Sequence, residues 1–316
     1  MEISKPHAAL LSSPGMGHLI PVLELGKSLV THSNFTVTVF VVASHKSPAE
    51  SNHLLDSLMR PKLFDIVQLP PIDISGLVDA NAAVITQLAI MMREVRPALR
   101  SAISATNSKP RPTVLIVDLF GTESFHLADE LDMLKYVYVP TSAWFLALTI
   151  HVPFLDKEVK GEYNNQIEPL RIPGCKAVRP EDVVHPMLDR TNQQYFEYVR
   201  LASEMPMSDG ILLNTWEDLE PSTLAALRDE SLLGRVAKIP VYPVGPLTRT
   251  ISGLRSELFD WLDNQPSESV IFVSFGSGGT LSYEQMTELA LGLELSQQRF
   301  IWVVRPATTE AVAVPA

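Results

Sequence analysis

A histidine preceded by two glycines is the part of this sequence best suited to chemistry. His18 follows Gly15-Met16-Gly17 and lies between a short apolar run, Ala8–Leu11, and an amphipathic segment, Leu19–Val30. The pattern predicts a histidine where a buried strand gives way to a helix, which is where open α/β sheets bind ligands. An imidazole with a pKa of about 6.5 is a workable general base at neutral pH, and glycines let a ligand approach the backbone. Capping or packing at a helix start is the alternative interpretation of this histidine.

A carboxylate and a glycine-rich loop end two further apolar runs. Val114–Val117 leads into Asp118, and Val270–Phe275 leads into Gly276–Thr280, which precedes a helix. Asp118 would accept the second ring N–H of His18, hold its tautomer and stabilise the imidazolium; capping the next turn is its alternative role. The loop N–H groups and the Ser277 hydroxyl suit a phosphate, although the loop is neither GxGxxG nor a Walker sequence.

The elements that must position these residues follow an alternating pattern. Apolar runs alternate with helical periodicity, which predicts an α/β protein whose parallel sheet is covered by helices on both faces. A proline-punctuated stretch, 157–190, predicts a long surface excursion, and 239–246 is too rich in proline for a central strand and predicts an extended bridge, followed by a flexible linker near 247–254. The expected strands are 8–13, 37–42, 64–69, 114–117, 136–139, 210–213, 270–275 and 300–304, and the expected helices 19–30, 48–58, 82–104, 123–131, 143–152, 194–204, 219–229, 257–263 and 283–297.

Composition narrows the function classes. The 316 residues allow about two domains, and with 46% hydrophobic and 19% charged residues the chain can bury a large core. A net charge of −11 argues against nucleic acid as a partner. Cys175 is the single cysteine, which fits a reducing, cytoplasmic compartment. Tyr138–Leu155 has no full charge, but it is short for a spanning segment and predicts a buried helix rather than a transmembrane one.

Several longer motifs together resemble the plant family-1 UDP-dependent glycosyltransferases of the GT-B type. The resemblance runs from about Pro6 to Arg305, and within the family it is closest to the group that includes hydroquinone, monolignol and anthocyanidin glucosyltransferases. It implies two Rossmann-like domains with parallel sheets. The motifs are PGMGHLIPVLELGKSL (Pro14–Leu29), VDLFGT (Val117–Thr122), VPTSAW (Val139–Trp144), LLNTWEDLEP (Leu212–Pro221), YPVGPL (Tyr242–Leu247), LFDWLDNQP (Leu258–Pro266) and the run Val270–Arg305.

The resemblance implies transfer of glucose from UDP-glucose to a phenol with inversion and without a metal. His18 would be the base and Asp118 its support. Ser277 would contact the diphosphate and Thr141 a glucose hydroxyl, with a turn residue and a helix N-cap as the respective alternatives. Gly17 and Gly276 complete the donor-binding set. An apolar slot for the acceptor is expected from residues that flank these groups in sequence, for which core packing is an equal alternative: Met16, Leu119, Phe120 and Trp144.

One expected motif is missing from the sequence. Members of the family carry a donor-binding box that opens with a tryptophan, contains an HxGxNS-type segment and closes with an acidic–glutamine pair, and nothing here matches it. We therefore expect an acceptor-binding domain over 1–246, and a linker with the first part of a nucleotide-sugar-binding domain over 247–316. On this reading the chain alone is weakly active or inactive. The alternative is a non-catalytic truncated form that binds small phenolics or associates with a fragment supplying the rest. A nicotinamide dehydrogenase is disfavoured, because the first turn lacks GxGxxG and no acidic residue closes the second strand.

Overall fold

The computed structural model describes residues 5–42, 63–79, 81–105, 110–248, 257–276 and 281–304. The chain forms two compact units, Met1–Arg249 (unit 1) and Thr250–Ala316 (unit 2). The sequence analysis divides the chain a few residues earlier, after Pro246. The helix expected over 48–58 and the linker residues 249–254 lie outside the described residues.

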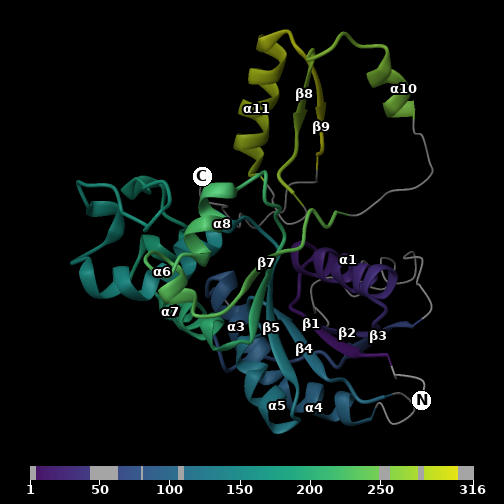
Figure 1. Ribbon diagram of the computed structural model, residues 1–316. Helices are drawn as coiled ribbons and strands as arrows, with labels where there is room; N and C mark the ends of the chain where they lie inside the picture. Colours follow the sequence, from purple (N-terminus) through teal and green to yellow (C-terminus); the bar gives the residue numbers. More distant parts are fainter. Residues whose placement is uncertain are drawn as a thin grey trace. The chain divides into compact units, whose positions relative to one another are not determined.

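Unit 1 is built on one parallel sheet of seven strands in the order β3-β2-β1-β4-β5-β6-β7 (Figure 1). Helices cover both faces of this sheet, so the side chains on both faces of its central strands are buried. The sequences of these strands are therefore nearly continuous hydrophobic runs. The register pairs Leu11 of β1 with Val117 of β4. The strands are β1 His7–Ser12, β2 Thr36–Val42, β3 Phe64–Leu69, β4 Val114–Asp118, β5 Leu134–Val139, β6 Gly210–Leu213 and β7 Val241–Pro243.

Two hydrophobic clusters cover the two faces of this sheet. The smaller one combines the inward face of α1 (Met16–Ser33) with strand residues such as Ala8 and Leu10. The larger one takes the alternate strand residues, Ala9 and Leu11 among them, and the helices on the other face. These helices are α3 Val84–Glu94, α4 Arg96–Ser104, α5 Phe125–Glu130, α6 Ala143–Glu158, α7 Gln193–Glu204, α8 Pro221–Arg228 and α9 Gly234–Ala237. None of the helices in the described part of the chain combines the length and apolar content that crossing a bilayer requires.

The single helix expected over 82–104 is two helices, α3 and α4, which meet at Val95. Pro97 stands in the first turn of α4 and has no N–H to offer the carbonyl of Arg93, so a continuous helix would leave that carbonyl unpaired. The Nε of Arg96 donates to this carbonyl instead, at 2.8 Å. The prediction of one helix was therefore wrong at the proline.

The segment expected to be an extended bridge is a strand at the edge of the sheet. In β7, Val241–Pro243 pairs in parallel with Ile211–Leu213 of β6, and β7 is the last strand in the sheet order. A strand that pairs on one side only tolerates prolines, since its outer N–H groups have no ladder to join. The proline content excluded a central strand correctly, but it did not exclude an edge strand.

The long excursion 157–190 is fastened at its base by Arg190. The Arg190 guanidinium donates to the carbonyls of Val159 and Gly161, both at 2.7 Å, and to a carboxylate oxygen of Asp156 at 2.8 Å. It also lies over the ring of Tyr163, 4.9 Å from the centroid. The start and end of the excursion are therefore held together beside the end of α6.

Unit 2 is a small α/β piece. It contains α10 Glu257–Asp263, β8 Val270–Val273, α11 Tyr283–Ser296 and β9 Arg299–Trp302, with β8 and β9 paired in parallel. A capping box formed by Ser282 and Gln285 begins α11. Among the described residues of this unit only Leu293 is a buried hydrophobic, whereas Phe272 is 69% exposed and Phe300 is 38% exposed. Val303 and Val304, which follow β9, are also exposed.

Candidate active site

The candidate catalytic residues lie at the point where the strand order of unit 1 reverses. From β1 the chain crosses over to β2 on one side, whereas β4, its other neighbour, continues the sheet in the opposite direction. The loops that leave the carboxyl ends of β1 and β4 therefore diverge, and open α/β sheets bind ligands in the crevice between such loops. His18 follows β1, and Asp118 is the last residue of β4.

His18 is placed by the first turn of α1. Gly15 precedes the helix with φ of +107°, a left-handed region that favours glycine. This turn directs the chain from the buried end of β1 into the helix, where the amide of His18 donates to the carbonyl of Gly15 at 3.1 Å. The imidazole is 22% exposed, so the ring is partly accessible to solvent. The sequence expected a helix from Leu19, but the helix begins at Met16 and includes the histidine.

Asp118 is fully buried, and its carboxylate accepts hydrogen bonds from two neighbours. Oδ2 receives the backbone N–H of Ser13 at 2.8 Å and also the Ser13 hydroxyl, and Oδ1 receives the N–H of Phe120 at 3.2 Å. These hydrogen bonds offset part of the free-energy cost of burying a charged carboxylate. Ser13 was not singled out by the sequence analysis, although a hydroxyl residue just beyond a buried strand is a usable signal for such a contact.

The structure brings His18 and Asp118 together. Nδ1 of His18 lies 3.3 Å from Oδ2 of Asp118. The contact does not meet hydrogen-bond geometry, and this buried Nδ1 has no hydrogen-bond partner. Asp118 Oδ2 already accepts two hydrogen bonds from Ser13, which uses both of its lone-pair directions. Hydrogen bonds between catalytic groups also often shorten only when substrate binds. With Nδ1 facing the carboxylate, Nε2 is the ring nitrogen available to a substrate.

The four apolar residues expected around the acceptor come from both faces of the sheet. The ring of Phe120 meets the imidazole edge to face, with centroids 5.3 Å apart. Leu119 and Trp144 are half-buried and pack against the larger cluster that contains Phe120, whereas Met16 packs against the cluster under α1. The Phe120 ring therefore borders His18 directly, while Met16 belongs to the opposite layer.

The candidate donor-binding residues are distributed over both units. Thr141 is exposed, between the end of β5 and the start of α6. It is not the N-cap of α6: Ser142 holds that position, with its hydroxyl accepting from the N–H of Phe145 at 3.2 Å. Gly17 is exposed on α1, and Gly276 is exposed in unit 2 with φ of +73°. Ser277 lies outside the described residues.

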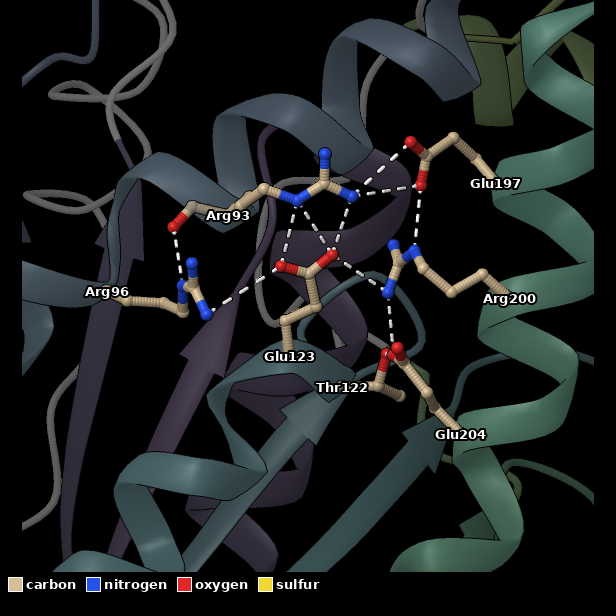
Figure 2. Close-up of polar contacts among 7 residues, drawn as sticks. All are labelled: Arg93, Arg96, Thr122, Glu123, Glu197, Arg200 and Glu204. Atoms are coloured by element: carbon tan, nitrogen blue, oxygen red, sulfur yellow. Dashed lines mark hydrogen bonds and ion pairs between the residues drawn. The ribbon is translucent and has the colours of Figure 1, made fainter.

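The turn that carries Asp118 continues into a charged cluster centred on Glu123 (Figure 2). Glu123 belongs to η1 (Thr122–Ser124) and accepts from Nε and Nη2 of Arg93 at 2.9 and 2.7 Å. Nη1 of Arg200 lies 3.0 Å from the same carboxylate. Burial raises the pKa of Glu123, but the hydrogen bonds from Arg93 and the charges of both arginines outweigh it and hold that pKa below its ordinary value.

Helix α7 supplies the other half of this cluster. Arg200 donates to Glu197 at 2.8 Å and to Glu204 at 2.6 Å, and Glu204 accepts the hydroxyl of Thr122, also at 2.6 Å (Figure 2). Glu197 also reaches Arg93 at 3.3 Å. The cluster therefore ties η1 to α3 and α7 at the point where the chain leaves the turn containing Asp118.

Within the described residues no group of three or more His, Cys, Asp or Glu side chains is arranged to hold a metal ion.

No protein-family model matches the chain.

Comparison with known proteins gives the class and the family. The anthocyanidin 3-O-glucosyltransferase 5 of Manihot esculenta is 64% identical over 309 residues, covering 97% of this chain and 63% of that protein. UDP-glycosyltransferase 72E2 of Arabidopsis thaliana is 52% identical over 308 residues, with the same coverage of 97% and 63%. A solved complex between 3,4-dichloroaniline and a Polygonum tinctorium UDP-glucosyltransferase capable of glucosylating indoxyl aligns with a TM-score of 0.87 at 37% identity, covering 97% of this chain and 67% of that one.

The α/β fold with its seven-stranded parallel sheet is therefore that of the GT-B glycosyltransferases. The chain spans 63% of the length of the curated relatives it matches here. It belongs to the family of plant UDP-glycosyltransferases.

Proposed function

We propose that this chain carries the acceptor-binding and catalytic part of an inverting UDP-glycosyltransferase. The reaction moves glucose from UDP-glucose to a hydroxyl of a small phenolic acceptor. The observation that supports this most directly is the His18–Asp118 pair at the reversal point of the sheet, with Nδ1 and Oδ2 3.3 Å apart. The family supports the donor class, since the relatives are UDP-glycosyltransferases.

In the proposed reaction Nε2 of His18 takes the proton of the acceptor hydroxyl. The phenol oxygen forms a bond to the anomeric carbon from the face opposite the diphosphate, and the bond from that carbon to the diphosphate oxygen breaks. UDP leaves with the electron pair of that bond. Asp118 stabilises the imidazolium that forms and keeps Nε2 unprotonated beforehand. His18 passes its proton to solvent after product release. No metal takes part in this proposal.

The proposed binding residues divide between donor and acceptor. Thr141 contacts a sugar hydroxyl, Gly17 leaves room for the donor, and Gly276 and Ser277 receive the diphosphate. Phe120, Leu119, Met16 and Trp144 form the apolar surroundings of the acceptor, and Phe120 has the firmest basis since its ring borders the imidazole. The single cysteine is compatible with the proposed cytoplasmic setting.

A pair of acceptors of different acidity tests the base assignment. The purified chain is incubated with UDP-glucose and either 4-methoxyphenol, which is neutral at about pH 8, or 4-nitrophenol, which is largely ionised there. His18→Ala should slow transfer to 4-methoxyphenol by about 10²–10⁴-fold, the usual contribution of a general base. Transfer to 4-nitrophenol should fall far less, because its proton has already left.

Matched reactions decide between the alternatives. His126→Ala removes an exposed histidine of α5 and should leave both rates unchanged, and added EDTA should also change nothing. We expect the chain alone to be weakly active or inactive, so the assay is run both with the chain alone and with the portion of the Manihot esculenta relative that lies outside the match. Equal losses for the two phenols would contradict the base assignment. Binding of phenols without transfer in either mixture would support the non-catalytic alternative.

A further inference from the structure

The beginning of helix α6 is held by a carboxylate from a distant part of the chain. Oε2 of Glu220 accepts the N–H of Ala143 at 2.7 Å, and Oε1 accepts the N–H of Trp144 at 3.0 Å. Glu220 lies 77 residues beyond Ala143 in the sequence. With the Ser142 hydroxyl on the N–H of Phe145, consecutive amides of the first turn of α6 all have side-chain acceptors, although a helix cannot pair them internally.

A second contact orients the Glu220 carboxylate. The hydroxyl of Thr215, a residue that is 1% exposed, donates to Oε2 at 2.6 Å. Thr215 and Glu220 both lie in the loop that follows β6, and the N–H of Asn214 in this loop donates to the carbonyl of Val139 at 3.0 Å. The loops after the paired strands β5 and β6 are thus joined by backbone and side-chain contacts. These contacts give a structural role to Asn214, Thr215 and Glu220 of the LLNTWEDLEP motif.

Because Glu220 pairs with the first N–H groups of α6, these groups are not available to a ligand. The positive end of a helix with free N–H groups attracts anions, but here Glu220 already occupies it with a negative charge. A phosphate is therefore not expected at this helix end. What the segment presents instead are side chains, among them the exposed Thr141 and the half-buried Trp144.

We propose that Glu220, oriented by Thr215, is a positioning residue that fixes the Thr141–Trp144 segment for sugar transfer. Glu220 does not touch substrate; it acts through the backbone of Ala143 and Trp144. This inference rests on the proposed function, in which Thr141 contacts the sugar and Trp144 the acceptor.

The test combines amide hydrogen exchange in the full chain with transfer kinetics in the full chain complemented by the portion of the Manihot esculenta relative described above. Glu220→Gln keeps the size of the side chain but removes the charge and one acceptor oxygen. Exchange of the Ala143 and Trp144 amides should become about tenfold faster or more, as expected from the loss of hydrogen bonds to a charged group. The kcat/KM for UDP-glucose with 4-methoxyphenol should fall by about tenfold or more.

A matched control and a double variant separate positioning from general stability. Glu217 lies in the same loop but is exposed and paired with Arg228 at 2.9 Å, so Glu217→Gln should alter neither measurement. If Glu220 acts through Thr141, the variant Thr141→Ala/Glu220→Gln should lose less activity than the product of the two single losses.

Three results would overturn the inference. These are unchanged exchange at Ala143 and Trp144 in Glu220→Gln, faster exchange with unchanged kcat/KM, and losses that multiply fully in the double variant. A wild-type chain that transfers no sugar, alone or complemented, would overturn the proposed function and with it a role of Glu220 in transfer. Exchange would in that case still report separately whether the carboxylate holds the helix.

Discussion

Replacing Glu123 by glutamine should destabilise unit 1 in a pH-dependent way. The carboxylate is 13% exposed, and it receives two nitrogens of Arg93 and faces Arg200 at 3.0 Å. Glutamine keeps the shape but leaves both guanidinium groups without their central charge. Removing one partner of a buried ion pair costs about 3–5 kcal/mol.

The exposure of the partners reduces this cost. The Arg93 side chain is 32% exposed and that of Arg200 is 24% exposed, so solvent compensates part of the lost interaction. We expect a loss of about 2 kcal/mol in the free energy of unfolding at pH 7. For a domain of this size that loss corresponds to a fall of about 4–8 °C in Tm.

The sign of the pH dependence follows from the depressed pKa of Glu123. A carboxyl with a lower pKa in the folded than in the unfolded state stabilises the fold above the unfolded value, here 4.5. This stabilisation disappears as the pH falls through the lower pKa of the folded state. The difference between wild type and Glu123→Gln should therefore be full at pH 7 and shrink at pH values well below 4.5.

Urea unfolding followed by circular dichroism at several pH values measures this difference. Glu130→Gln is the control, because Glu130 pairs with Arg100 at 3.0 Å while the two side chains are 51% and 61% exposed; it should cost about 0.5 kcal/mol or less. A Glu123→Gln cost that is the same at pH 3 and pH 7, or no larger than that of Glu130→Gln, would refute the assignment of Glu123 as the centre of the cluster.

Two further substitutions test packing and titration. A Cβ at Gly121 would lie 2.7 Å from Cβ of Val117, whereas one at Gly292 of α11 meets nothing within 4 Å. Gly121→Ala should therefore cost about 1–3 kcal/mol in urea unfolding, whereas Gly292→Ala should stabilise its helix by up to about 1 kcal/mol. Effects of the same sign would contradict the close contact at Gly121. Burial lowers the pKa of His151 below 6.5, so the wild type should lose stability as the pH falls below 6.5, and His151→Leu should show a smaller loss between pH 7.5 and pH 5 in the same assay. A parallel fall in both proteins would argue against this titration.

The sequence predicted the central sheet well because its strands are buried on both faces. The run Val37–Val42 is apolar except for Thr38, and every residue in it is buried. The edge strand β3 also has the bounds that were expected for it, although it is less buried. The meeting of His18 and Asp118 was also predictable, since the carboxyl ends of parallel strands share one edge of the sheet. Their roles in catalysis remain predictions.

Features that depend on long-range contacts or on proline geometry were harder to predict. Pro97 carries a local signal for the break between α3 and α4, but the helical periodicity continues across it and predicts a single helix. The bond from Glu220 to the start of α6 joins segments 77 residues apart, and no spacing rule within either segment reveals it. The hydrogen bond from the Ser13 hydroxyl to Asp118 could be assigned only once the position of Asp118 in the fold was known.

The fastening of the excursion by Arg190 has a consequence for how this fold can diversify. One guanidinium clamps both ends of the excursion through the carbonyls of Val159 and Gly161 and the carboxylate of Asp156. Exposed residues between the clamped ends can be exchanged, inserted or deleted without pulling on the sheet, because loop length adds little entropic cost once the ends are joined. The buried residues of the excursion, such as Tyr163, Ile172 and Met187, belong to the larger hydrophobic cluster and must keep their packing. Evolution, or a protein engineer, can thus vary the outer surface of unit 1 over many residues while the strand ends that carry His18 and Asp118 stay where they are.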